Sequence, residues 1–166
     1  MEKTLMLHCP FSSSQSFLLG RFPKRDVRFI TALGGLFPWD DELFLAMLET
    51  FLVTENIQTI YFVQDLQSKF IREGIRQGSD LGNNTVQEIW KVFGKHLPEI
   101  LTEGSTSGQV SKLSLFLMEE QTIRLYGHPP LQRLVQENNI QVKGILSDQS
   151  KSKSIEFQIQ PALQFS

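Results

Sequence analysis

The chain has 166 residues, 40% of them hydrophobic, and this length is typical of one domain built around a single core. The 16 basic and 18 acidic side chains give a formal net charge of -2, and neither sign forms a run along the chain. Because nucleic-acid binding depends on clustered Lys and Arg, we expect no nucleic-acid partner. No apolar stretch reaches the roughly 20 residues of a membrane-spanning helix, so we expect no membrane partner.

The N-terminal segment and the cysteine content indicate a cytoplasmic protein. A short apolar stretch at residues 4–7 leads into a polar, serine-rich segment, and no small-residue cleavage site follows it. The N-terminal segment therefore does not resemble a signal peptide. Cys9 is the single cysteine, so an internal disulfide is excluded, and this suits a reducing compartment. We expect residues 1–166 to form one domain without internal repeats.

The first part of the chain alternates β-rich segments with one helix. Residues 4–9 (TLMLHC) and 27–32 (VRFITA) are short, apolar and bounded by turn residues, which predicts two strands. Asp40 or Asp41 can cap the helix ELFLAMLETFLV, which is apolar over most of its circumference. We expect this helix to be buried on more than one side or covered by a partner subunit. Residues 57–63 (IQTIYFV) predict a central strand.

The middle of the chain has mainly helical character. Residues 67–78 predict a polar helix, and the apolar side chains of residues 85–93 share one helical face, with a DLGNN turn between the two segments. Residues 100–110 (ILTEGSTSGQV) predict a flexible loop from their composition. Residues 111–126 predict a further helix with apolar side chains on one side.

The last two segments, 140–146 (IQVKGIL) and 154–159 (SIEFQI), predict a hairpin whose final strand lies at a sheet edge. Strands that alternate with helices are typical of a largely parallel sheet covered on both faces. The sequence therefore predicts an α/β fold: a three-layer, Rossmann-like sandwich with a mostly parallel central sheet and an antiparallel edge strand.

A ligand site in such a fold is expected at the carboxyl ends of the strands. Loops converge there and helix N-termini point inward. In this chain those ends are Cys9 with the CPFSS loop, the segment Leu33–Gly35, and the QDLQS loop that follows Val63.

The motifs at these ends are similar to those of the β-class carbonic anhydrases. In that family the first strand ends in Cys-x-Asp-Ser-Arg, the second runs into Arg-Asn-Ala-Gly, and the third ends in Gly-His-x-x-Cys-Gly. The resemblance implies a β-carbonic-anhydrase-like fold and a homodimer, and it does not extend over residues 72–120. The similar segments are LHCPFSS at 7–13, VRFITALGG at 27–35, the helix DELFLAMLETFL, IQTIYFVQDLQSKF at 57–70, and GHPPLQRLVQENNIQVKGILSD at 127–148.

The residues that correspond to the family's zinc site are largely different. Cys9 falls at the position of the first zinc-binding cysteine. Phe11 stands where the family has an aspartate next to the metal, and Ser13 where it has the arginine that pairs with that aspartate. Asp65 takes the place of the histidine ligand, and Ser68 that of the second cysteine.

The glycine-rich motif after the second strand is also altered. Thr31 and Ala32 replace its arginine and asparagine, whereas Gly34 remains. The resemblance thus implies a vestigial pocket without catalytic residues. Its lining is expected to be Cys9, Phe11, Ser13, Thr31, Gly34, Gly35, Asp65 and Ser68.

The family's zinc chemistry requires better metal ligands than the residues at these positions supply. In the family the metal lowers the pKa of a bound water to about 7, and three protein ligands hold it while one position stays open. A thiolate, a carboxylate and a hydroxyl stand at the ligand positions, and a serine hydroxyl is a poor zinc ligand. We expect no zinc and no other cofactor. The leading hypothesis is a non-catalytic binding, regulatory or structural homodimer whose small ligand, if it has one, is unknown.

Three other interpretations remain open at this point. The chain could be a carbonic-anhydrase-like metalloenzyme with altered ligands, in which Cys9, Asp65 and a histidine hold zinc. It could also be a flavodoxin-like nucleotide- or flavin-binding module that shares only the order of elements. Finally, Phe37 and Trp39 beside the apolar helix could mark a subunit contact.

Overall fold

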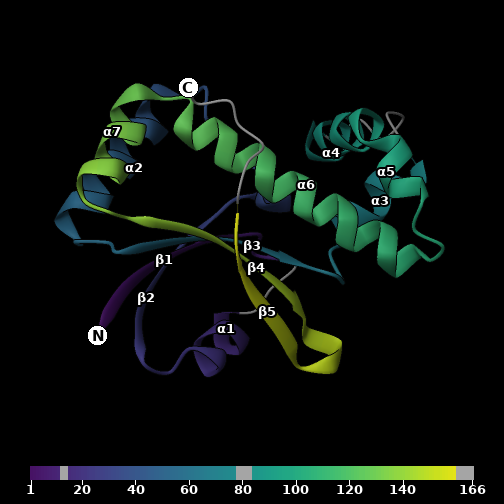
Figure 1. Cartoon of the computed structure of the whole chain (residues 1–166), viewed down its shortest axis with the longest axis horizontal. Helices are drawn as coiled ribbons and strands as arrows, with labels where there is room; N and C mark the ends of the chain where they lie inside the picture. Colours follow the sequence, from purple (N-terminus) through teal and green to yellow (C-terminus); the bar gives the residue numbers. More distant parts are fainter. Residues whose placement is uncertain (12–14, 78–83, 160–166) are drawn as a thin grey trace.

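The computed structural model describes residues 1–11, 15–77 and 84–159, so Ser13 and most of the predicted DLGNN turn lie outside the described residues. Its centre is a five-stranded sheet with the strand order β2-β1-β3-β4-β5 (Figure 1). The first four strands in this row pair in parallel, and β5 pairs with β4 in antiparallel. The strands are β1 (Glu2–His8), β2 (Arg25–Thr31), β3 (Thr59–Asp65), β4 (Gln141–Asp148) and β5 (Lys153–Gln158).

The predicted strands and sheet are confirmed, with boundaries that differ by one or two residues. The mostly parallel sheet with its antiparallel edge strand follows from the alternation of strands and helices along the chain. The predicted three-layer α/β class is therefore also confirmed.

Helices cover the two faces of the sheet unequally (Figure 1). Helix α1 (Gln15–Arg21) packs on one face, where Leu18 meets Met6 and Tyr61. On the other face lie α2 (Glu42–Thr54), α6 (Thr106–Tyr126) and α7 (Pro129–Glu137). The alternation of side chains along a strand separates the two layers, because neighbouring residues point to opposite faces.

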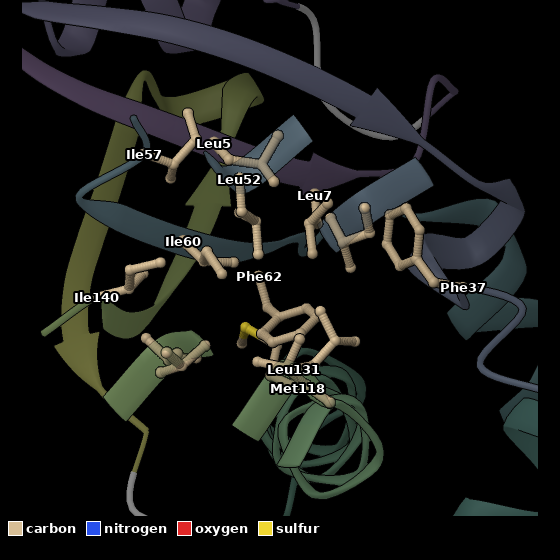
Figure 2. Close-up of a cluster of buried hydrophobic side chains, with 14 of the residues drawn as sticks. Leu5, Leu7, Phe37, Leu52, Ile57, Ile60, Phe62, Met118, Leu131 and Ile140 are labelled. Atoms are coloured by element: carbon tan, nitrogen blue, oxygen red, sulfur yellow. The ribbon is translucent and has the colours of Figure 1, made fainter. Parts of the chain in front are cut away.

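The main core fills the space between the sheet and α2, α6 and α7. Figure 2 shows Phe62 of β3 pointing from the sheet toward Met118 of α6 and Leu131 of α7. All three side chains are at most 2% exposed. A second cluster of buried side chains joins α3 (Lys69–Gln77), α4 (Asn84–Lys95) and α5 (Leu97–Leu101) to α6 at one end of the molecule (Figure 1).

The structure corrects the prediction of a loop at residues 100–110. Helix α5 ends at Leu101, and α6 begins at Thr106 within the segment that was predicted to be a loop. Ser105 caps α6, since its Oγ accepts a hydrogen bond from the Gly108 backbone N–H at 3.1 Å. Helix α1 was not predicted, because its seven residues are too few for a clear periodicity.

Helix α2 begins as predicted and is buried on one side. The Asp41 carboxylate accepts hydrogen bonds from the backbone N–H groups of Leu43 and Phe44. Leu48 is fully buried, whereas Leu43 is 82% exposed and Met47 is 44% exposed. Within one chain, the apolar helix therefore leaves part of its surface open to solvent.

The structure places Phe37 and Trp39 in the main core, where they are 6% and 1% exposed. Their suggested role as a surface contact between subunits is therefore wrong. None of the helices in the described part of the chain combines the length and the apolar character that crossing a bilayer requires.

Candidate functional site

The candidate site lies at the carboxyl ends of β1, β2 and β3. Cys9, which follows β1, is fully buried, and its Sγ accepts a hydrogen bond from the Gly34 backbone N–H at 3.3 Å. Gly34 and Gly35 have φ values of 67° and 70°, a region that L-residues with a Cβ rarely adopt. This left-handed turn is what brings the Gly34 N–H to the thiol.

Gln64 fills the space between β3 and the glycine turn. Its Nε2 donates a hydrogen bond to the Gly34 carbonyl at 3.1 Å, and a Cβ placed on Gly35 would lie 2.7 Å from that nitrogen. The side chain is 1% exposed, and its Oε1 is buried without a partner among the described residues. The sequence analysis did not identify Gln64, although a polar residue at the end of an apolar strand was an available signal.

Asp65 connects β3 to β4. Its Oδ2 accepts hydrogen bonds from the Ser147 hydroxyl at 2.6 Å and from the Gln149 backbone N–H at 3.3 Å, and its Oδ1 accepts one from the Gln67 backbone N–H at 2.8 Å. Burial raises the pKa of Asp65 above its ordinary value, although these three hydrogen bonds favour the ionised form. The carboxyl group is thus occupied by contacts within the fold.

Ser68 is the residue before α3 and is fully buried. Its Oγ accepts a hydrogen bond from the Ile71 backbone N–H at 3.4 Å, which is the role of an N-cap. The hydroxyl that stands at the second cysteine position of the family motif therefore begins a helix.

The remaining predicted pocket residues are divided between the surface and the interior. Gly34 and Gly35 are buried with Cys9, whereas Thr31 is exposed. Phe11 is 73% exposed, and its ring centroid lies 6.5 Å from that of Phe70. Ser13 lies outside the described residues.

The donor atoms at the strand tips already have hydrogen-bond partners within the chain. The Asp65 carboxylate and the Ser68 hydroxyl already accept hydrogen bonds from backbone N–H groups, and the Cys9 sulfur accepts one from Gly34. The described residues hold no group of three His, Cys, Asp or Glu side chains arranged to bind a metal. Zinc in proteins is held by three or four such ligands in tetrahedral arrangement.

The sheet order and the helices on both of its faces define a three-layer α/β sandwich. More specifically, the chain has the fold of the β-class carbonic anhydrases. It is similar to a tetrameric β-carbonic anhydrase of Sordaria macrospora, with a TM-score of 0.78 and 16% identity over 93% of this chain and 80% of that one.

Two other solved β-carbonic anhydrases show the same likeness. For CafA of Aspergillus fumigatus the TM-score is 0.79, with 16% identity over 96% of this chain and 76% of that one. For the Coccomyxa β-carbonic anhydrase in complex with acetazolamide the TM-score is 0.74, with 18% identity over 93% of this chain and 71% of that one. No family model matches the sequence, and no curated protein matches it significantly. The likeness is therefore one of fold.

Proposed function

We propose that this chain is a non-catalytic relative of the β-class carbonic anhydrases, with no competent zinc site, that acts in the cytoplasm as a binding, regulatory or structural protein. The observation that carries the proposal is the Asp65 carboxyl group, which is buried and accepts three hydrogen bonds, one from the Ser147 hydroxyl of β4 and two from the backbone N–H groups of Gln67 and Gln149. A carboxylate held in this way stabilises the sheet and has few lone pairs left to bind a metal.

The residues around Cys9 support the same proposal. Phe11 stands where the family motif has an aspartate, and an apolar ring neither orients a water molecule nor accepts its proton. Its side chain is mostly in solvent. The side chain of Gln64 occupies the space next to the glycine turn. The family motif has a glycine, without a side chain, at the corresponding position. At the ends of the strands, side chains thus pack against and hydrogen-bond to other groups of the same chain.

A carbon dioxide hydration assay tests the loss of catalysis. The purified protein is measured with and without added zinc, beside the Cys9→Ala variant. We expect all samples to hydrate carbon dioxide at the rate of the buffer. Hydration that depends on zinc and disappears in Cys9→Ala would instead support a metalloenzyme with altered ligands.

We also propose that the protein is a homodimer that uses the open face of α2. Leu43 and Met47 lie one turn apart on this face. Thr50 adds no free hydroxyl, because its Oγ1 donates to the Ala46 carbonyl at 2.9 Å. The likeness to a tetrameric enzyme favours a second copy of this chain as the partner that covers such an uncharged surface.

Sedimentation velocity tests the homodimer. We expect the wild-type protein to sediment as a dimer and the Met47→Glu variant as a monomer, because the new charge would be buried without a partner. Leu101→Glu is the matched control, since Leu101 is a 57% exposed residue of α5 away from α2. A monomeric wild-type protein would refute the homodimer.

A further inference from the structure

A cavity of about 560 Å³ lies between the segment 36–41, helix α4 and helix α6. Its volume is within the range of small-molecule sites, which is roughly 300–1,000 Å³. One face of α6 lines it, because residues three and four positions apart share a helix face. The residues on which the following argument depends are Leu117, Glu120, Gln121 and Arg124 of α6 and Glu88 and Val92 of α4.

Gln121 provides a buried polar group with an unused donor in this cavity. The side chain is 7% exposed, and its Oε1 accepts hydrogen bonds from the Phe37 backbone N–H at 3.0 Å and from Trp39 Nε1 at 2.8 Å. These two donors fix the orientation of the amide. Among the described residues none accepts a hydrogen bond from Gln121 Nε2, so this group is available to a molecule in the cavity.

The charges around the cavity favour a cation. Four carboxylates line it, whereas Arg124 is the single cation of the lining and already pairs with Asp40 at 2.8 Å. Glu88 and Glu120 each pair with a lysine of α4 that is not part of the lining. The four carboxylates together with Arg124 and these two lysines leave a net charge of -1, which repels an anionic ligand and attracts a cationic one.

We propose that this cavity binds a small organic cation that carries a carbonyl or hydroxyl oxygen. The oxygen accepts a hydrogen bond from Gln121 Nε2, the cationic group faces Glu88 and Glu120, and the hydrocarbon part contacts Val92 and Leu117. The inference goes beyond the proposed function, because it uses none of the residues at the strand tips.

The test compares argininamide with agmatine, which has the same two kinds of cationic group but no carboxamide. Both are titrated into the labelled protein at slightly acidic pH, and the indole N–H signals of Trp39 and Trp90 are followed by NMR. The Trp39 indole reports on the site, because it donates to the Oε1 of Gln121. We expect both probes to shift the Trp39 signal and argininamide to bind about ten-fold more tightly, as one further hydrogen bond to the Gln121 amide predicts.

Two variants complete the test. Gln121→Glu keeps the oxygen that accepts from Phe37 and Trp39 but removes the Nε2 donor, so the preference for argininamide should disappear. Glu88→Lys reverses a charge that is 56% exposed and leaves Gln121 untouched, so both probes should bind at least about ten-fold more weakly. The proposal is overturned if neither probe shifts the Trp39 signal, if Gln121→Glu keeps the preference, or if Glu88→Lys binds both probes like the wild type. Should Gln121→Glu not fold, the Glu88→Lys result decides.

Discussion

The Asp65 carboxylate accepts a hydrogen bond from the Ser147 hydroxyl, directly across the parallel pairing of β3 with β4, with 2.6 Å between Oδ2 and Oγ. The position that corresponds to a histidine ligand in the family motif thus joins two central strands. This hydrogen bond therefore stabilises the folded chain at the carboxyl ends of the two strands.

Replacing Asp65 should therefore destabilise the protein strongly. The Asp65→Ala variant leaves two backbone N–H groups without their acceptor and removes the nearer of the two acceptors of the Ser147 hydroxyl, so we expect a loss of about 3 kcal/mol in the free energy of unfolding. Urea denaturation measures this loss. Asp40→Ala is the matched control, because Asp40 is 92% exposed in an ion pair and should contribute less than about 1 kcal/mol. Equal effects of the two substitutions would contradict the structural role of Asp65.

The glycine turn should tolerate no side chain at Gly35. In Gly35→Ala a Cβ would have to adopt the left-handed conformation and would approach Gln64 Nε2 at 2.7 Å, so we expect a loss of about 2 kcal/mol in stability. Gly94 in α4 is the control position, because a Cβ there meets nothing within 4 Å. Gly94→Ala should raise stability by about 0.5 kcal/mol, since alanine favours a helix. Thermal unfolding of both variants measures the contrast, and a stabilised Gly35→Ala would refute the described turn.

Gln121 should be required for the packing of the segment before α2. The Gln121→Leu variant leaves the Phe37 N–H and the Trp39 indole N–H buried without an acceptor, which is expected to cost about 3 kcal/mol. Gln136→Leu, at an exposed position of α7, should change stability by less than about 0.5 kcal/mol. Tryptophan fluorescence during denaturation, to which Trp39 and Trp90 both contribute, follows both variants. A Gln121→Leu variant as stable as Gln136→Leu would disprove the role of this amide.

The acidic side of the stability profile should depend on Glu156 in β5. Burial alone raises the pKa of Glu156, but the hydrogen bond from Tyr61 and the charges of Arg25 and Lys143 outweigh it, so the pKa is lowered below its ordinary value of 4.5. A carboxyl group with a lowered pKa in the folded state stabilises the protein above the ordinary pKa, and this contribution is lost as the pH falls through the lowered value.

Denaturation midpoints measured from neutral pH to values well below the ordinary pKa of 4.5 test this dependence. The wild type should lose more stability on acidification than Glu156→Gln, whose side chain does not titrate. Parallel curves for the two proteins would show that Glu156 contributes nothing to acid sensitivity.

The sequence correctly predicts the strands and helices whose local residue pattern agrees with their packing in the folded chain. The strand predicted at residues 57–63 forms as β3, because β-branched and aromatic residues suit a strand that is buried on both faces. The prediction of a loop at residues 100–110 was wrong. The Gly and Ser residues of this segment have a low helix propensity, which is typical of a loop. In the structure Ser105 caps α6, and the burial of α6 against α3 and α4 compensates for that low propensity.

The sequence indicates which strand ends are candidate site positions, but not the contacts that their residues make. The resemblance of the motifs names Cys9 and Gly34 as pocket residues at the ends of neighbouring strands, and Cys9 does contact Gly34. The roles of Gln64 and Gln121 depend on partners 30 and 84 residues away, namely the Gly34 carbonyl and the Phe37 N–H. No local pattern in the sequence encodes such long-range hydrogen bonds.

The zinc content of the purified protein decides whether the strand ends hold a metal. The full chain is produced in zinc-supplemented medium, dialysed against metal-free buffer and measured by native mass spectrometry together with elemental analysis. We expect a mass equal to that of the polypeptide and no stoichiometric zinc. One zinc ion per chain that survives dialysis, and that is lost in Cys9→Ala, would contradict it.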